Sequence, residues 1–282
     1  MLVAVVLICF GLLVGFQLIG SRSRQLLDSN GLEMYGGRPA PFAGFSNLVM
    51  VAGHAVFTSA NYVNADAESS WWLETYQQAA GQAQTFVDHI RAGIKEAARD
   101  PRALLMFSGG ETRREAGPKS EAQSYWAVAD AADWYGQAAS VRGRAVTEEH
   151  ARDSFENLLF SVCRFRELTG HYPLNITVVS YAFKEGRFAS LHRDAIAFPA
   201  SRFFYVGTPA AESVQTAARE GEAKVAAMYK EDPYGCNGAL HEKRLLRDPY
   251  RRRLPYPQGC PEMEALFTYC GPRLYQGRLP WD

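Results

Sequence analysis

The sequence lacks the short motifs by which several large enzyme classes are recognised. It contains no GxGxxG or Walker GxxxxGK[ST] phosphate loop, no HExxH motif and no GxSxG nucleophile turn. It also lacks an excess of charge, because 30 lysines and arginines balance 30 aspartates and glutamates. Without a net positive field the chain is not expected to bind nucleic acid.

Cysteine is sparse and not spaced for metal binding. The five cysteines contain no CxxC and no His/Cys pattern typical of zinc, so no metal site is expected. Cys236, Cys260 and Cys270 could pair in an exported domain, but the simpler prediction is reduced structural thiols. The sequon Asn175-Ile176-Thr177 begins a predicted buried strand, and we expect it to carry no glycan.

One long apolar run is present. Leu2–Gly20 has no charged residue and is long enough to cross a bilayer core, so residues 1–22 are a candidate transmembrane anchor. Arg22 and Arg24 follow it directly, and the positive-inside rule then predicts a cytoplasmic domain. The alternative is a buried helix in a soluble cytoplasmic protein, which the three glycines of the run also allow (Gly11, Gly15 and Gly20).

The rest of the chain alternates strand and helix patterns. Residues 23–44 are predicted to be a linker, residues 45–230 a domain, and residues 231–282 an irregular extension packed on that domain. Strands are predicted at Asn47–Phe57, Ala103–Phe107, Val141–Val146, Ile176–Tyr181 and Arg202–Val206. Helices are predicted at Trp72–Ala97, Ser120–Tyr135, Thr147–Leu168, Lys184–Ile196 and Pro209–Tyr229, with a short one at Glu262–Cys270. This order predicts an α/β fold, a three-layer Rossmann-like arrangement with helices on both faces of a mainly parallel sheet.

The stretch Ala103–Tyr125 is the centre of the predicted site. An apolar strand stops at Ser108-Gly109-Gly110, a charged loop follows, and Ser120 with Gln123 three residues later is typical of a helix N-cap. The loop therefore lies at the carboxyl end of a parallel strand, the edge at which open α/β sheets bind ligands.

Basic residues near predicted helix starts indicate an anion site. Lys184 and Arg187 follow one strand, and Arg113 precedes the helix that Ser120 begins. A cation at that end opposes the helix dipole unless an anion compensates it. The alternative is that nearby carboxylates neutralise these bases at the surface (Glu111, Glu115, Glu121 and Glu185).

Further candidate residues carry hydrogen-bonding or titrating groups. Glu121 and Glu148 are predicted in first helical turns, where a carboxylate either stabilises the dipole or serves as a general base. Ser154 and Asn157 lie one turn apart on one helix. His54 and Ser180 lie at or near strand ends, where a packing role and a ligand contact remain open for the histidine.

Four of these segments together resemble a known family. The order SGG (Ser108–Gly110), SEA (Ser120–Ala122), Glu148 with Ser154 to Asn157, and Ser180 with Arg187 is similar to the YdcF/SanA/ElyC type, domain-of-unknown-function family 218. GHAVF upstream and CGPRLY near the end look most like its fungal branch. The resemblance implies a Rossmann-like fold and, through bacterial relatives, S-adenosylmethionine binding or envelope maintenance. The residues shared by position are Gly109, Gly110, Glu121, Glu148, Asn157 and Arg187.

The sequence departs from the family pattern at three positions. Ser154 stands in place of the usual Thr, Ala151 in place of Ser, and Lys184 in place of His. A charged lysine cannot replace a histidine acid or base near neutral pH, so the last departure weakens a catalytic role and leaves anion binding intact.

Three functions follow as expectations. The first is binding of an anionic or nucleotide-like small molecule, with S-adenosylmethionine a candidate ligand through the resemblance. The second is a hydrolase or transferase that uses Glu121 or Glu148 as a base and Arg113 or Arg187 to steady developing charge. The third is a membrane-tethered interaction protein.

The apolar run generates the first testable prediction. The full chain should resist carbonate extraction from membranes, and deletion of Met1–Arg24 should release it into the soluble fraction. If the domain faces the cytosol, protease should digest it in sealed vesicles without detergent, and Asn175 should carry no glycan. Extraction of the full chain by carbonate would contradict the anchor, and a protected or glycosylated domain would contradict the orientation.

Overall fold

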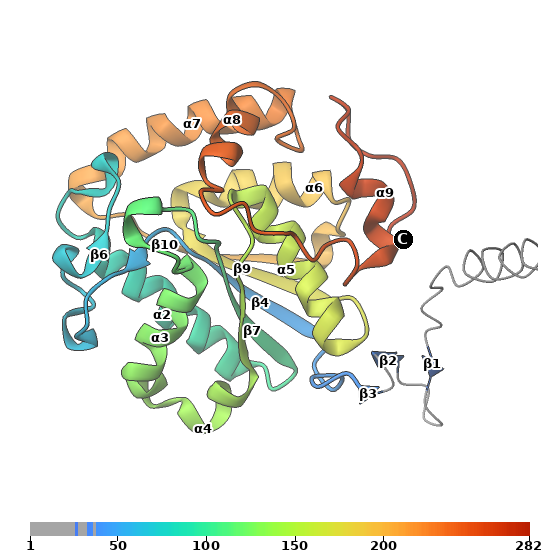
Figure 1. Ribbon diagram of the computed structural model, residues 1–282, viewed down its shortest axis with the longest axis horizontal. Helices are drawn as coiled ribbons and strands as arrows, with labels where there is room; N and C mark the ends of the chain where they lie inside the picture. The colour runs from blue at the N-terminus through green and yellow to red at the C-terminus, as the bar shows by residue number, and fades with distance from the viewer. Residues whose placement is uncertain (1–25, 28–32, 36–37) are drawn as a thin grey trace, which may run out of the picture. The chain divides into compact units, whose positions relative to one another are not determined.

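The structure is a computed structural model that describes residues 26–27, 33–35 and 38–282 (Figure 1). The predicted anchor Leu2–Gly20 lies outside the described residues. The chain divides into two units, Met1–Pro39 and Ala40–Asp282. Within the first, the predicted linker forms a small antiparallel sheet of β1 (Leu26–Leu27), β2 (Glu33–Tyr35) and β3 (Arg38–Pro39). No described helix is both long and apolar enough to cross a membrane.

The second unit is built on a five-stranded parallel sheet. Its strands lie in the order β10-β9-β4-β7-β8, and every neighbouring pair is parallel. Their bounds are β4 Asn47–Ala52, β7 Ala103–Ser108, β8 Ala145–Glu148, β9 Asn175–Tyr181 and β10 Phe203–Thr208. Both β4 and β7 are buried along their whole length, which explains why all but one residue of each is apolar.

Helices cover both faces of this sheet and give the predicted three layers (Figure 1). One apolar core lies under α2 (Gln82–Arg99), α3 (Glu121–Ala131) and α4 (Ala138–Val141). The other lies under α5 (Ser154–Thr169), the π-helical η8 (Arg187–His192), α6 (Arg193–Ala195) and α7 (Gln215–Glu231). The predicted α/β fold is therefore confirmed.

Tertiary pairing moves the start of one predicted helix. The helix predicted from Trp72 begins only at Gln82, because Trp71–Trp72 forms strand β6 and pairs with β5 (Val56–Phe57). The Trp71 ring packs edge-on against Phe57 and Phe86, with ring centroids 5.1 and 5.3 Å away. These aromatic contacts hold the tryptophan pair in extended backbone although its sequence spacing fits a helix.

The start of a second helix was also predicted too early. Thr147 and Glu148 pair with Phe107 and Ser108 in the sheet, so both belong to β8. Helix α5 begins instead at Ser154, after Asp153 accepts a hydrogen bond from the Glu156 amide as N-cap. The prediction that Glu148 stabilises a first helical turn is therefore wrong.

Helix α3 begins at the predicted cap but ends earlier than predicted. Ser120 accepts a hydrogen bond from the Gln123 amide, as the sequence indicated, whereas the helix ends at Ala131. Asp133, Trp134 and Tyr135 then turn with φ of 47°, 53° and 52°. Such left-handed backbone costs about 1–2 kcal/mol per residue. Full burial of Trp134, whose Nε1 donates to Asp130, offsets that cost.

The C-terminal extension packs on the α5 side of the sheet. It contains α8 (Gly238–Leu246) and α9 (Glu264–Phe267), which follows the 3-10 turn Pro261–Met263. Its apolar side chains belong to the same core as helix α5, among them Tyr256, Met263, Leu266 and Leu279. Figure 1 shows this red segment lying along the outside of the yellow and orange helices.

Two disulfides join the extension, so the prediction of reduced thiols is wrong for four cysteines. Cys163 of α5 bonds Cys260, and Cys236 bonds Cys270 within the extension. The fifth cysteine, Cys9, lies outside the described residues. The extension is thus held by covalent bonds as well as by apolar packing.

The two disulfides should stabilise the fold by different amounts. Replacing Cys163 and Cys260 by serine should lower the free energy of unfolding by about 2–5 kcal/mol. The matched pair Cys236→Ser/Cys270→Ser opens a loop of 34 rather than 97 residues and should cost about 1 kcal/mol less. Urea unfolding followed by circular dichroism measures both. Equal unfolding curves for the wild type with and without reductant would contradict the prediction.

Candidate functional site

The strand order places a topological switch point between β4 and β9. From β4 the chain builds β7 and β8 on one side and then β9 and β10 on the other. Ligands of open α/β sheets bind outside the carboxyl ends of the strands where the order reverses. His54, just beyond β4, and Ser180, in β9, meet at this point with Nε2 and Oγ 3.1 Å apart.

Lys184 lies beside this pair. In the part of the chain that the structure describes, no carboxylate forms an ion pair with it. Its Nζ is 3.5 Å from Nδ1 of His54 and 4.9 Å from the ring centre of Tyr181. Burial holds the pKa of Lys184 well below its ordinary value, and the charge of Arg187 lowers it further. The charge of Glu222 raises the pKa of Lys184, but this carboxylate already accepts a hydrogen bond from Arg187.

Two cations from the extension act on the same place. Lys243 and Arg247, one turn apart at the end of α8, both lower the pKa of Lys184. Desolvation by neighbouring atoms lowers the pKa of Lys243 itself to about 8 although the residue is exposed, and Arg247 and Arg187 add to that shift. Sequence reasoning missed both residues. Nothing local in α8 marks them, because only the packing of the extension brings them to the sheet edge.

Arg187 and Ser154 form a second cluster at this edge. Arg187 donates Nε and Nη2 to the two oxygens of Glu222, both at 2.7 Å, so its charge is compensated. Its Nη1 donates to Oγ of Ser154 at 2.5 Å. The same Oγ lies 2.8 Å from Nε2 of His192. Glu222 and His192 were not identified from the sequence.

Ser108, Asn157 and Glu148 come together in a buried network. The Ser108 hydroxyl donates to Glu148 at 2.9 Å, and the Asn157 amide donates to the carbonyl and hydroxyl oxygens of Ser108, both at 2.9 Å. The amides of His150 and Ala151 also donate to the Glu148 carboxylate. Burial nevertheless raises the pKa of Glu148 to about 7.

Glu121 explains the glycines around it. Its carboxylate accepts a hydrogen bond from Thr112 at 2.5 Å. A Cβ at Gly53 or Gly109 would lie 2.7 or 2.8 Å from the Cβ of Glu121, and one at Gly110 would lie 2.8 Å from the Ala151 carbonyl oxygen. Close packing therefore accounts for the two glycines after β7, and their presence does not by itself indicate a phosphate site.

Arg113 is buried and already partnered. Its guanidinium lies over the ring of Trp72, 5.6 Å from the centroid, and its Nε is 3.3 Å from a carboxylate oxygen of Glu74. Glu111, one of the expected neutralising residues, pairs instead with Arg252 at 2.6 Å. Of the three basic residues predicted to hold an anion, only Lys184 is left without a carboxylate in ion-pair contact among the described residues.

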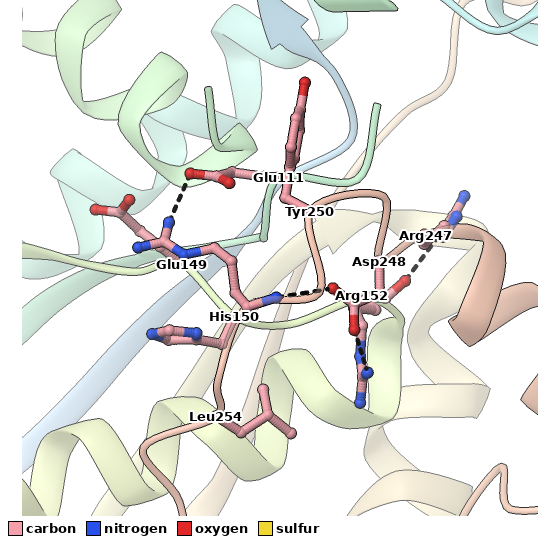
Figure 2. Close-up of a pocket in the computed structure, with 9 residues that line it drawn as sticks. Glu111, Glu149, His150, Arg152, Arg247, Asp248, Tyr250 and Leu254 are labelled. Atoms are coloured by element: carbon pink, nitrogen blue, oxygen red, sulfur yellow. Dashed lines mark hydrogen bonds and ion pairs between the residues drawn. The ribbon is translucent and has the colours of Figure 1, made fainter. Parts of the chain in front are cut away.

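The extension covers the β8 side of the sheet edge. Figure 2 shows the side chains that line a cavity where its segment meets the loop after β8. Two ion pairs lie among these residues, Arg252–Glu111 and Arg152–Asp248. The cavity measures about 10 Å³, room for roughly one water molecule. A larger hollow of about 610 Å³ lies between α2, α3 and the turn Tyr62–Asn64, and contains none of the predicted site residues. Among described residues, no three His, Cys, Asp or Glu side chains are placed to hold a metal ion.

Comparison with known proteins finds a distant relative. The chain is 28% identical over 261 residues to the uncharacterized protein YOR238W of Saccharomyces cerevisiae, an alignment that covers 75% of this chain and 86% of that protein. This indicates distant homology. No family model matches the chain, and no solved structure matches it.

The raised pKa of Glu148 predicts a pH-dependent stability. In the folded protein this carboxyl holds its proton up to about pH 7, whereas its ordinary pKa is 4.5. Its contribution therefore lowers the free energy of unfolding as the pH rises from about 4.5 through 7, by roughly 3 kcal/mol in total. Glu148→Gln should flatten urea-unfolding stability over that range. The exposed control Glu220→Gln should keep the wild-type slope, and an unchanged slope in Glu148→Gln would contradict the assignment.

Proposed function

We propose that the domain binds an anionic small molecule, phosphorylated or nucleotide-like, at the carboxyl edge of the sheet between β4 and β9. The observation that carries the proposal is Lys184, a cation that contacts His54 at the switch point and has no carboxylate in ion-pair contact in the described chain. We further propose that the chain belongs to the YdcF/SanA/ElyC-like family that its motifs resemble.

The charges around Lys184 support a ligand with more than one negative charge. Arg187, Lys243 and Arg247 all act on this lysine, and among described residues only Arg187 has a bonded carboxylate of its own. Holding like charges close together costs free energy unless an opposite charge compensates them. A phosphate placed among these side chains would accept their hydrogen bonds and remove that cost.

The same charges rank the candidate ligands. S-adenosylmethionine, suggested by the resemblance, carries a sulfonium and an ammonium group against a single carboxylate. Its net positive charge would meet the repulsion of Lys184, Lys243 and Arg247. Nucleotides and sugar phosphates carry two or more negative charges and fit the cluster better.

Glu148 supports the enzymatic alternative less well than its pKa suggests. A carboxyl that titrates near pH 7 suits a general acid or base. However, Glu148 is 1% exposed and its oxygens already accept hydrogen bonds from Ser108, His150 and Ala151. A base must reach the proton that it removes, so binding is the better-supported function of the predicted residues.

For localisation we propose a single membrane anchor at Leu2–Gly20. Arg22 and Arg24 favour a cytoplasmic domain. The disulfides Cys163–Cys260 and Cys236–Cys270 favour the opposite, oxidising side. The protease-protection experiment distinguishes the two orientations, and the anion site requires neither one.

Removal of the unpaired cation tests the proposed site. Calorimetry should first identify a ligand in a panel of nucleotides, sugar phosphates and S-adenosylmethionine. Lys184→Met should then weaken binding of that ligand at least tenfold, about 1.4 kcal/mol. Lys95→Met, on the exposed face of α2, makes the same charge change and should leave the affinity unchanged. No binding by any phosphorylated compound, or equal affinity in Lys184→Met, would contradict the proposal.

A further inference from the structure

We infer that Ser154 is a nucleophile, activated by His192 and Arg187, for hydrolysis of a phosphate ester held at the carboxyl edge. This inference rests on the proposed anion site. It assigns chemistry to a serine–histidine pair that lies beside that site and involves neither Glu121 nor Glu148.

The position of Ser154 suits a nucleophile. It is the first residue of the 16-residue helix α5, and its side chain is partly accessible to solvent. Asp153 occupies the N-cap and satisfies the Glu156 amide, which leaves the Ser154 hydroxyl free for other contacts. The positive end of the helix dipole also favours an oxyanion at this place.

Arg187 and His192 contact the Ser154 hydroxyl, and Tyr229 also lies within hydrogen-bond range of it. An arginine can only donate hydrogen bonds, so the Oγ of Ser154 accepts from Arg187. Burial and the charge of Arg187 hold the pKa of His192 well below its ordinary value, so the imidazole is neutral near pH 7. A neutral imidazole carries one proton, and when it sits on Nδ1, which has no hydrogen-bond partner among the described residues, Nε2 accepts the Ser154 proton across 2.8 Å.

Ser180 and His54 form a second serine–histidine pair at this edge, but here the histidine donates the hydrogen bond to the serine. Nδ1 of His54 faces the amine of Lys184, which donates to it, so the proton of the imidazole sits on Nε2. Nε2 therefore donates to Ser180 and cannot accept its proton. Ser180 is also fully buried. Of Ser154 and Ser180, only Ser154 is accessible to solvent and has a histidine nitrogen that can take its proton.

Arg187 connects Ser154 to the anion site. The guanidinium that contacts Ser154 also acts on Lys184 and Lys243. Its Nε and Nη2 are used by Glu222, whereas Nη1 carries a second N–H besides the one given to Ser154. A phosphoryl group that accepts this N–H is placed against the Ser154 oxygen.

The step balances with water as the second reactant. The electron pair of the Ser154 O–H bond forms the Oγ–P bond, and the proton moves to Nε2 of His192. The P–O bond to the alcohol breaks, and the leaving oxygen takes the pair together with that proton. Water then attacks the phosphoserine with His192 again as base, which releases inorganic phosphate and restores the serine.

The test uses the purified full chain with two defined probes. A fluorophosphonate should form a covalent adduct that peptide mass spectrometry maps to Ser154, and p-nitrophenyl phosphate should release p-nitrophenol. Ser154→Ala should abolish both signals. His192→Gln should slow both about 100-fold, the usual scale of a lost general base. Ser161→Ala removes a buried hydroxyl without a hydrogen-bond partner on the same helix and should retain both signals.

Thermal unfolding of each variant shows whether lost activity reflects lost structure. Because His192 is fully buried, Ser154→Ala is the deciding variant if His192→Gln unfolds. An unlabelled Ser154, an adduct at another serine, or hydrolysis retained in Ser154→Ala would overturn the inference. If phosphorylated ligands bind in calorimetry while Ser154 stays unlabelled, this inference fails and the proposed binding function stands. If neither occurs, both fail.

Discussion

The geometry of the whole sheet edge depends on the hydrogen bonds at Ser108. This last residue of β7 binds Glu148 at the end of β8 and Asn157 in α5 through buried side chains. The backbone amides of the next two residues, Gly109 and Gly110, donate hydrogen bonds to the carbonyl oxygens of Glu148 and Ala151. An unpaired polar group here would cost a few kcal/mol, so the contacts form together. They fix where α5 begins and hence where Ser154 stands.

The charges at this edge fall into two kinds. Arg187 and Arg113 are buried beside carboxylates, Glu222 and Glu74, which compensate their charges. Lys184 has no such bond in the described chain, and its pKa falls because burial disfavours its charged form. The two arginines thus have their charge compensated within the protein, whereas the partly buried Lys184 has no such compensation among the described residues, which supports the proposed anion site.

The extension contributes charges to the proposed anion site and also covers part of the sheet edge. It brings Lys243 and Arg247 toward Lys184, and its segment over the β8 side closes the space there to about one water. Disulfides and apolar packing hold it in place. The domain alone would thus present an incomplete set of charges, which explains why the irregular C-terminal sequence cannot be treated as dispensable.

The sequence by itself determined the features that local patterns encode. Apolar runs located four of the five parallel strands, whereas the predicted strand Val141–Val146 was wrong in its first part, because Val141 ends α4 and β8 begins only at Ala145. Ser120 marked a helix start through a local hydrogen bond. Only the tertiary structure decided the strand at Trp71–Trp72, the place of Glu148 in β8, the cysteine pairs and the approach of α8 to Lys184. The physical reason is that these four features depend on contacts between residues far apart in the sequence. The energies of such contacts exceed local propensity, and the contacts leave no local sequence pattern.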